Sequence, residues 1–112
     1  MADRFAVSGE LWIWRPETGK GSWHFLTIGG DAAEDIRTAA LLNRLELGLP
    51  KKRGWGAVKV QVTIGETVWK TSIFPESGGN GFLLPIKAAV RKAESLVAGD
   101  RVEFELEPIF GD

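Results

Sequence analysis

An unbroken alternation of apolar and polar residues over positions 57–64 is the feature that most constrains the fold of this chain. The apolar members are all β-branched, and they are Val58, Val60, Val62 and Ile64. A period of two is typical of a β-strand that buries one face. Gly65-Glu66 follows with glycine first, which predicts a two-residue type II′ turn and a return strand over 67–74. We therefore expect a β-hairpin in the middle of the chain, and the large apolar residues on both faces of its second strand predict a central or covered position.

The rest of the chain predicts further strands and two helices. Alternation predicts strands over 4–14, 22–28 and 101–107, and the short apolar segment 82–84 predicts another. Apolar residues at helical spacing predict helices over 32–47 and 85–96. The expected order is β-β-α-β-β-β-α-β with about six strands. This pattern is typical of an α+β protein, mainly β with two helices, that forms a small barrel or sandwich of antiparallel strands. We expect a single domain over residues 1–112.

The residue types that the chain lacks argue against most catalytic and metal chemistry. Cysteine is absent and His24 is the only histidine, so zinc would lack ligands. No serine lies in a Gly-x-Ser-x-Gly motif, and no glycine-rich segment has the spacing of a phosphate-binding loop. We interpret His24 as a packed or hydrogen-bonded residue and Glu103, Glu105 and Glu107 as a solvated strand face. No catalytic residue, metal or cofactor is therefore expected.

Charge and segment composition bear on location and partners. The absence of cysteine, of a signal peptide and of a long apolar segment favours a cytoplasmic protein without a membrane span. The net charge of −1 argues against a strongly basic nucleic-acid domain. Segment 49–75 nevertheless has a local charge of +4, from Lys51, Lys52, Arg53, Lys59 and Lys70 against Glu66. The sequence does not show whether these cations form one patch, and we favour a solvated face.

The chain has five tryptophans and no tyrosine. Trp12 and Trp14 fall on the polar face of the first strand, where they would either stack a planar ligand or be buried in a dimer interface. Trp55 lies close to Arg53 in a glycine-flanked loop, a combination that suits a ligand with a ring and an anionic group. We favour the alternative, that Trp55 closes one end of the barrel, because a small barrel needs a large side chain to fill its end. Trp23 and Trp69 are expected in the core.

Several segments together resemble a known family over about residues 5–107. They are Trp23-His-Phe-Leu, Arg53-Gly-Trp-Gly, the run from Val58 to Ile64, Trp69-Lys-Thr-Ser-Ile-Phe-Pro75, and Leu84-Pro-Ile-Lys-Ala-Ala-Val-Arg-Lys-Ala93 followed by Gly99-Asp100. This pattern resembles the bacterial domain-of-unknown-function family numbered nineteen hundred and five. The resemblance implies a closed double-split β-barrel, and it carries no assigned enzymatic activity over to this chain. The C-terminal part is also similar to the dimeric AbrB-like and MazE-like DNA-binding modules. In the longer family the barrel is expected to close within one chain, so the protein is either a monomer or a homodimer.

These observations favour a non-catalytic module that binds a small anionic or planar ligand, or a protein partner. The candidate ligand-binding residues are Arg53, Trp55, Trp69, Lys87 and Arg91. Trp12 and Trp14 are candidates for stacking or for an interface. The less favoured alternative is a nucleic-acid-binding regulator by analogy with AbrB-like barrels, and this basis is weak because one fold serves many functions. An enzyme ranks last.

Overall fold

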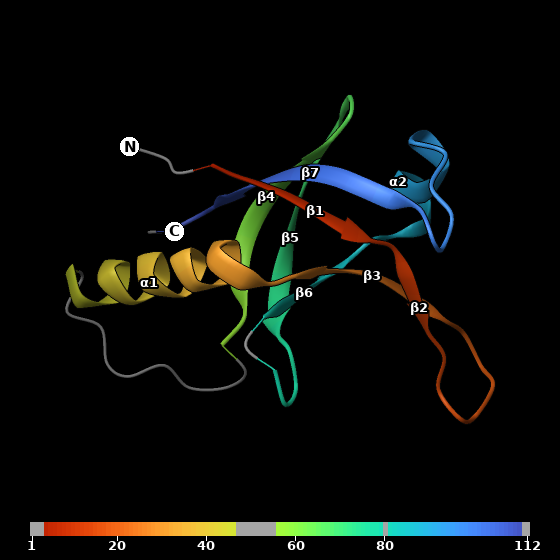
Figure 1. The fold of residues 1–112 in the computed structure, drawn as a ribbon, viewed down its shortest axis with the longest axis horizontal. Coiled ribbons are helices and arrows are strands. Elements are labelled where there is room, and N and C mark those ends of the chain that lie inside the picture. The colour runs from red at the N-terminus through yellow and green to blue at the C-terminus, as the bar shows by residue number, and fades with distance from the viewer. Residues whose placement is uncertain (1–3, 47–55, 80, 111–112) are drawn as a thin grey trace.

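A computed structural model describes residues 4–46, 56–79 and 81–110. Seven strands and two helices follow one another along these residues (Figure 1). They are β1 (Phe5–Glu10), β2 (Trp12–Trp14), β3 (Trp23–Ile28), α1 (Gly30–Glu46), β4 (Val58–Ile64), β5 (Thr67–Pro75), β6 (Phe82–Pro85), α2 (Ala88–Ala93) and β7 (Arg101–Pro108). The mainly β architecture with two helices is confirmed. The expected number of about six strands is wrong, because the segment predicted as one strand over 4–14 forms two.

The additional strand results from a corner at Leu11, which is fully buried between β1 and β2. β1 pairs with β7 whereas β2 pairs with β3, so the chain changes its partner at this residue. The Leu11 N–H donates to the Asp100 carbonyl at 2.9 Å, and the Leu11 carbonyl accepts from the Gly99 N–H at 2.8 Å. Gly99 has a φ of 99°, which favours glycine, and the Asp100 carboxylate accepts from the Val97 N–H at 2.9 Å. The turn before β7 therefore holds the corner in place.

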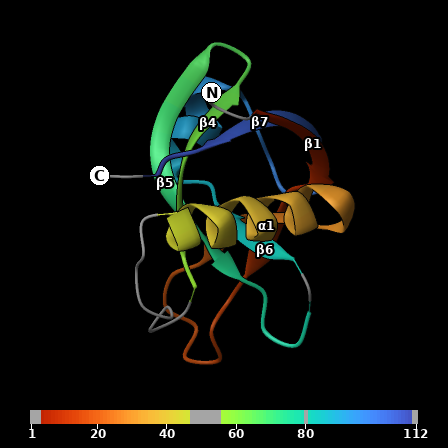
Figure 2. The same cartoon turned by 90° about the vertical axis from the view of Figure 1, so that its left-hand side faces the viewer.

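The strands form one antiparallel sheet in the order β1-β7-β4-β5-β6-β3-β2. The sheet curls into a half-barrel, with α1 across one end and α2 at the opposite end (Figures 1 and 2). β5 belongs to both halves, since Thr67–Ile73 pair with β4 and only Phe74 and Pro75 pair with β6. The expected closure of the barrel is not shown, because no strand pairing among the described residues joins the two edges, β1 and β2.

The core fills the concave side of this sheet. The four apolar residues predicted from the alternation in β4 all face it and are at most 5% exposed. β7 contributes its own alternating set, Val102, Phe104 and Leu106. On the opposite face, Arg4 lies 3.7 Å from Glu105 and 3.4 Å from Glu107, and such exposed pairs contribute roughly 0–1 kcal/mol each. The glutamates of β7 thus lie on the outer face of the sheet.

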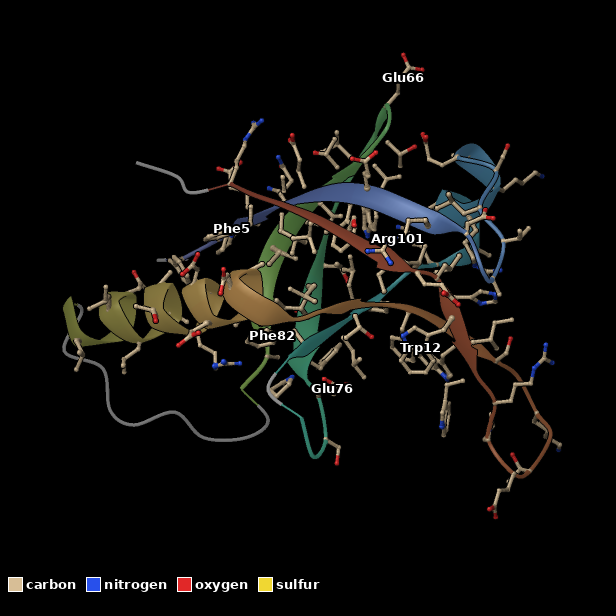
Figure 3. The ribbon with its side chains drawn as sticks, viewed as in Figure 1. Phe5, Trp12, Glu66, Glu76, Phe82 and Arg101 are labelled. Carbon is tan, nitrogen blue, oxygen red and sulfur yellow. The ribbon has the colours of Figure 1, made fainter. Side chains whose placement is uncertain are left out.

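The β4–β5 hairpin has the predicted turn, with Glu66 at its tip (Figure 3). Gly65 has a φ of 57° and Glu66 does not share this sign, as a type II′ turn requires. Both helices, in contrast, differ from their predicted bounds. α1 begins two residues earlier than expected, and its expected last residue, Leu47, lies outside the described residues. Neither helix in the described ranges is long and apolar enough to cross a membrane.

The expectation that Pro85 opens the second helix is wrong. Pro85 instead ends β6, where it pairs with Phe25 of β3. The next residue, Ile86, continues this association by donating its N–H to the His24 carbonyl at 2.8 Å. Lys87 is then the N-cap residue of α2 in an extended conformation. At Pro85 the side of β6 that faces away from β3 has no partner strand, because β5 pairs only with Phe82 and Leu83. A residue without an N–H is tolerated on such a side, so β6 continues to Pro85.

Candidate functional site

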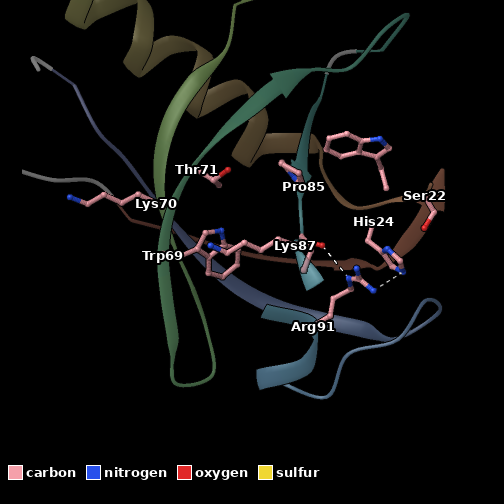
Figure 4. Close-up of a pocket in the computed structure, with 10 residues that line it drawn as sticks. Ser22, His24, Trp69, Lys70, Thr71, Pro85, Lys87 and Arg91 are labelled. Carbon is pink, nitrogen blue, oxygen red and sulfur yellow. Dashed lines mark hydrogen bonds between the residues drawn. The ribbon is translucent and has the colours of Figure 1, made fainter. Parts of the chain in front are cut away.

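A pocket of about 320 Å³ lies where β6 diverges from β5 (Figure 4). β3 contributes Trp23 and His24, and β5 contributes Trp69. Lys87 and Arg91 come from the N-cap and the last turn of α2. The other residues that line it are Ser22, Lys70, Thr71, Pro85 and Ile86. The pocket is a consequence of the split sheet, since paired strands would leave no room between β5 and β6.

Strand alternation determines which side chains reach this pocket from the sheet. Ile73 of β5 faces the core and is fully buried, so Trp69 faces the same side and packs against the core while remaining partly exposed. In β3, His24 shares a face with Leu26 and Ile28, both fully buried. The pocket therefore lies at the α2 end of the core, next to the fully buried Leu26 and Ile73.

Arg91 is the best-fixed cation of the pocket. Its Nε donates to the Ile86 carbonyl at 3.2 Å, and its Nη1 lies 3.4 Å from His24 Nε2 (Figure 4). A guanidinium only donates hydrogen bonds, so His24 Nε2 must accept and the ring proton belongs on Nδ1. The two contacts hold the Arg91 side chain on one side of the pocket and leave part of its donor set unused.

His24 is held in its neutral form. Burial lowers the pKa of His24 below its ordinary value, and the positive charges of Arg91 and Arg15 lower it further. His24 Nδ1 is buried and has no hydrogen-bond partner within the part of the chain that the structure describes. The expected packing of His24 is thus observed, and its hydrogen bonding is incomplete. At neutral pH its role toward Arg91 is that of an uncharged acceptor.

The charges around the pocket have one sign. None of the residues that line it is acidic, and within the described residues neither Lys87 nor Arg91 forms an ion pair with a carboxylate. Lys87 is exposed at the rim, whereas Lys70 points away from His24 and Arg91 (Figure 4). A concave site with unpaired cations concentrates a positive potential and attracts anions.

The structure brings together three of the five candidate residues predicted from the sequence. Trp69, Lys87 and Arg91 line one pocket although they are distant in sequence. Arg53 and Trp55 lie outside the described residues. Sequence reasoning missed Trp23 and His24 as pocket residues. In β3, His24 shares a face with the buried Leu26 and Ile28, but its contact with Arg91 depends on where α2 packs, for which the sequence has no signal.

The tryptophans of the β2–β3 hairpin gather on its outer face. The strand register places Trp12 opposite Phe25 and Trp14 opposite Trp23. Trp12 donates its Nε1–H to Thr27 Oγ1 at 2.9 Å, and its ring centroid lies 5.2 Å from that of Phe25. Trp14 and Trp23 are 48% and 57% exposed, so the expectation that Trp23 belongs to the core is wrong. The reason is that this narrow hairpin lies at the edge of the sheet, where nothing in the described residues covers its outer face.

The comparison with known families finds a match that covers most of the chain. A family described as "Domain of unknown function (DUF1905)" matches residues 8–106. The chain belongs to the DUF1905 family. The matched segment of this DUF1905 protein includes every residue that lines the pocket. A search of curated proteins finds no match to this DUF1905 chain.

Proposed function

We propose that this protein is a non-catalytic binding module whose pocket holds an anionic group, carried by a small planar ligand or by a partner protein. The observation that supports this most strongly is the arrangement of Arg91. Its side chain is fixed by Ile86 and His24, lies beside the unpaired Lys87, and has no carboxylate partner in the described residues. A half-buried charge without a counter-ion is costly, and an anion in the pocket would offset that cost.

The residues around Arg91 define what the ligand should look like. Arginine presents several N–H donors in one plane, which suits the paired oxygens of a carboxylate or phosphate. Lys87 would add a second positive charge at the rim. Trp69 and Trp23 would provide apolar walls for a ring, and the neutral His24 holds Arg91 without cancelling its positive charge, as a carboxylate partner would. A volume of about 320 Å³ is at the lower end of the range for small-molecule sites.

Binding of simple anions tests the proposal. Inorganic phosphate, benzoate and 1-naphthoate would be titrated at low salt while the melting temperature and the tryptophan fluorescence are recorded. We expect at least one of them to raise the melting temperature and binding to weaken as salt is added. Arg91→Gln should weaken binding about tenfold or more, corresponding to loss of a charge-assisted hydrogen bond.

Lys92→Gln is the matched control for this substitution. Lys92 is the next residue of α2, has the same charge and is exposed, but it does not line the pocket. Its replacement should leave the anion affinity unchanged. An equal loss of affinity in both variants, or no response of the unmodified protein to any of the three anions, would refute a specific anion pocket.

The strand register gives less support to the nucleic-acid alternative. Lys70 and Lys59 lie on the outer face of β4 and β5, but Lys70 is opposite Gln61, which in turn is opposite Glu107. Among the described residues these two lysines are therefore a local cluster, and they do not extend into the broad basic face that is typical of a nucleic-acid-binding domain. The basic residues 51–53 lie outside the described residues. We accordingly propose the anion pocket as the functional site, in a cytoplasmic protein, and keep nucleic acid as the second prediction, which a gel shift at low salt tests.

A further inference from the structure

One edge of β5 lacks a neighbouring strand along most of its length. β5 runs from Thr67 to Pro75, and its first seven residues pair with β4 on one side. On the other side β6 pairs only with Phe74 and Pro75. The backbone groups that point to this second side are therefore unpaired before Phe74. Such a row of free N–H and C=O groups is the structure to which another strand can add.

The hydrogen bonds identify which residues carry these free groups. The Glu76 N–H donates to the Gly81 carbonyl at 2.8 Å, on the side of β6. Backbone groups alternate in direction along a strand, so the other even-numbered residues point to the same side. The two-residue turn after Ile64 agrees, because it makes Thr67 bond to β4 instead. The residues at the free edge are Val68, Lys70 and Ser72, and no backbone hydrogen bond to β6 forms at any of them in the described part of the chain.

The free edge lies between two hollows, one on each face of the sheet. On the inner face is the anion pocket, which Lys70 and Thr71 border. On the outer face a second hollow, of about 360 Å³, is lined by Lys59, Lys70, Thr71, Ser72 and Ile109. Side chains of an extended peptide alternate between the two faces of a sheet. A strand added along β5 would therefore direct successive side chains toward the two hollows in turn, which is the way that peptide-binding sheet edges achieve specificity.

Both hollows are positively charged. Lys87 and Arg91 line the inner one, Lys59 and Lys70 line the outer one, and no acidic residue lines either. We propose that the free edge of β5 accepts an extended acidic peptide as an added strand, with its backbone on Lys70 and Ser72 and its carboxylates in the two hollows. This inference rests on the proposed function, because the inner hollow is the anion pocket.

Lys70 has a second possible role, which is to prevent strand addition. The experiment must distinguish this role from the selection of acidic strands. A lysine on an edge strand commonly prevents unwanted strand pairing. If this is its only role, Lys70→Gln should promote self-association and leave peptide binding unchanged or stronger. If Lys70 selects acidic strands, Lys70→Gln should weaken the binding of an acidic peptide several-fold.

The probe is a fluorescein-labelled, amidated heptapeptide, Thr-Glu-Glu-Val-Glu-Glu-Thr, in which two glutamates point to each face when it is extended. Its affinity would be measured by fluorescence anisotropy. Two control peptides accompany it: one with lysine in place of each glutamate, and one N-methylated at alternate residues, which keeps the charge but cannot pair. We expect the acidic peptide to bind at least tenfold more tightly than either control and than inorganic phosphate.

Amide hydrogen exchange provides the direct readout. Saturation with the acidic peptide should slow the exchange of the Lys70 and Ser72 amides, whereas saturation with phosphate should not. Ser72→Pro removes one edge N–H without changing charge, and proline is tolerated where the N–H is outside the ladder. Ser72→Ala keeps the N–H and lacks only the hydroxyl that lines the outer hollow, so it serves as the reference. Ser72→Pro should bind the peptide about fivefold or more weakly than Ser72→Ala does. If Ser72→Pro does not fold, the N-methylated peptide still tests the same bond from the other side.

The outcomes distinguish this inference from the proposed function. Phosphate binding without peptide binding overturns strand addition and leaves the anion pocket standing. Peptide binding that leaves the amide exchange of Lys70 and Ser72 unchanged also overturns strand addition and leaves the anion pocket standing. Protection of these amides by dimer formation in the absence of peptide would identify a second copy of the chain as the occupant and overturn the proposal. If neither peptide nor any anion binds, both proposals fail.

Discussion

A hydrogen bond between Thr67 and Glu94 connects the two sides of the split in the sheet. Thr67 Oγ1 donates to Glu94 Oε2 at 2.6 Å. Thr67 is the first residue of β5, and Glu94 is the C-cap residue of α2. Because β5 carries Trp69 and α2 carries Arg91, this bond ties together opposite walls of the pocket. We predict that its loss both destabilises the fold and loosens the pocket.

The geometry gives an expected magnitude. A short O–H···O⁻ bond is among the strong ones, and bonds to charged groups contribute about 1.5–3 kcal/mol net. Both side chains are partly exposed, so water replaces the lost partner and reduces the cost. We expect Thr67→Val to lower the free energy of unfolding by about 1–2 kcal/mol. For a chain of this size that corresponds to a decrease of about 4–8 °C in melting temperature.

A double-mutant cycle isolates this bond from other effects of the substitutions. Thr67→Val, Glu94→Leu and the double variant would be compared by urea unfolding at pH 7, and we expect a coupling energy of about 1 kcal/mol or more. Glu94→Gln, which keeps an acceptor oxygen, should lose less stability than Glu94→Leu. Single effects that add to within about 0.3–0.5 kcal/mol would refute the reasoning, since residues that do not interact behave in this way.

Three further predictions concern single positions. Ser95 follows α2 with a φ of 55°, so Ser95→Gly should raise the melting temperature by about 2–6 °C, whereas Ser95→Ala should not. A Cβ on the buried Gly81 would overlap the Ile28 carbonyl oxygen, so Gly81→Ala should lower the free energy of unfolding by about 1–3 kcal/mol in a denaturant titration. Gly29→Ala is the control, because a Cβ at Gly29 has no atom within 4 Å and should leave the stability unchanged. His24 has a lowered pKa when folded, so the unfolded chain takes up its proton first as the pH falls below about 6.5. The unmodified protein should therefore lose more stability than His24→Gln as the pH falls from 6.5 through the folded pKa, and parallel pH profiles would contradict this.

Much of the fold could be predicted because its strands expose one face and bury the other. In β4 and β7 the pattern of apolar residues corresponds directly to the buried positions, and Gly65 marks the turn. The corner at Leu11 could not be predicted, because side chains keep alternating while the chain changes its partner strand. Trp23 was misplaced for a related reason: a large apolar residue in a strand indicates burial only if another element covers that face.

The candidate site could be predicted only in part. Residue type alone pointed to Trp69, Lys87 and Arg91, since cations and indoles suit anionic and planar ligands. That they share a pocket follows from the divergence of β5 and β6, which is a property of long-range pairing. The fixed orientation of Arg91 likewise depends on His24 and on the Ile86 carbonyl, contacts that no local pattern in the sequence encodes.

The position of β7 between β1 and β4 has a consequence for how the chain folds. Phe5 pairs with Leu106, so the pairing of β1 with β7 joins residues that are about a hundred positions apart in the sequence. Closing so large a loop is slow, and proteins rich in such distant contacts fold slowly. The β4–β5 hairpin, by contrast, contains only local contacts and can form early. During synthesis β1 and the edge of β4 would remain unpaired until the last strand is made, which is the stage at which this protein is most exposed to aggregation.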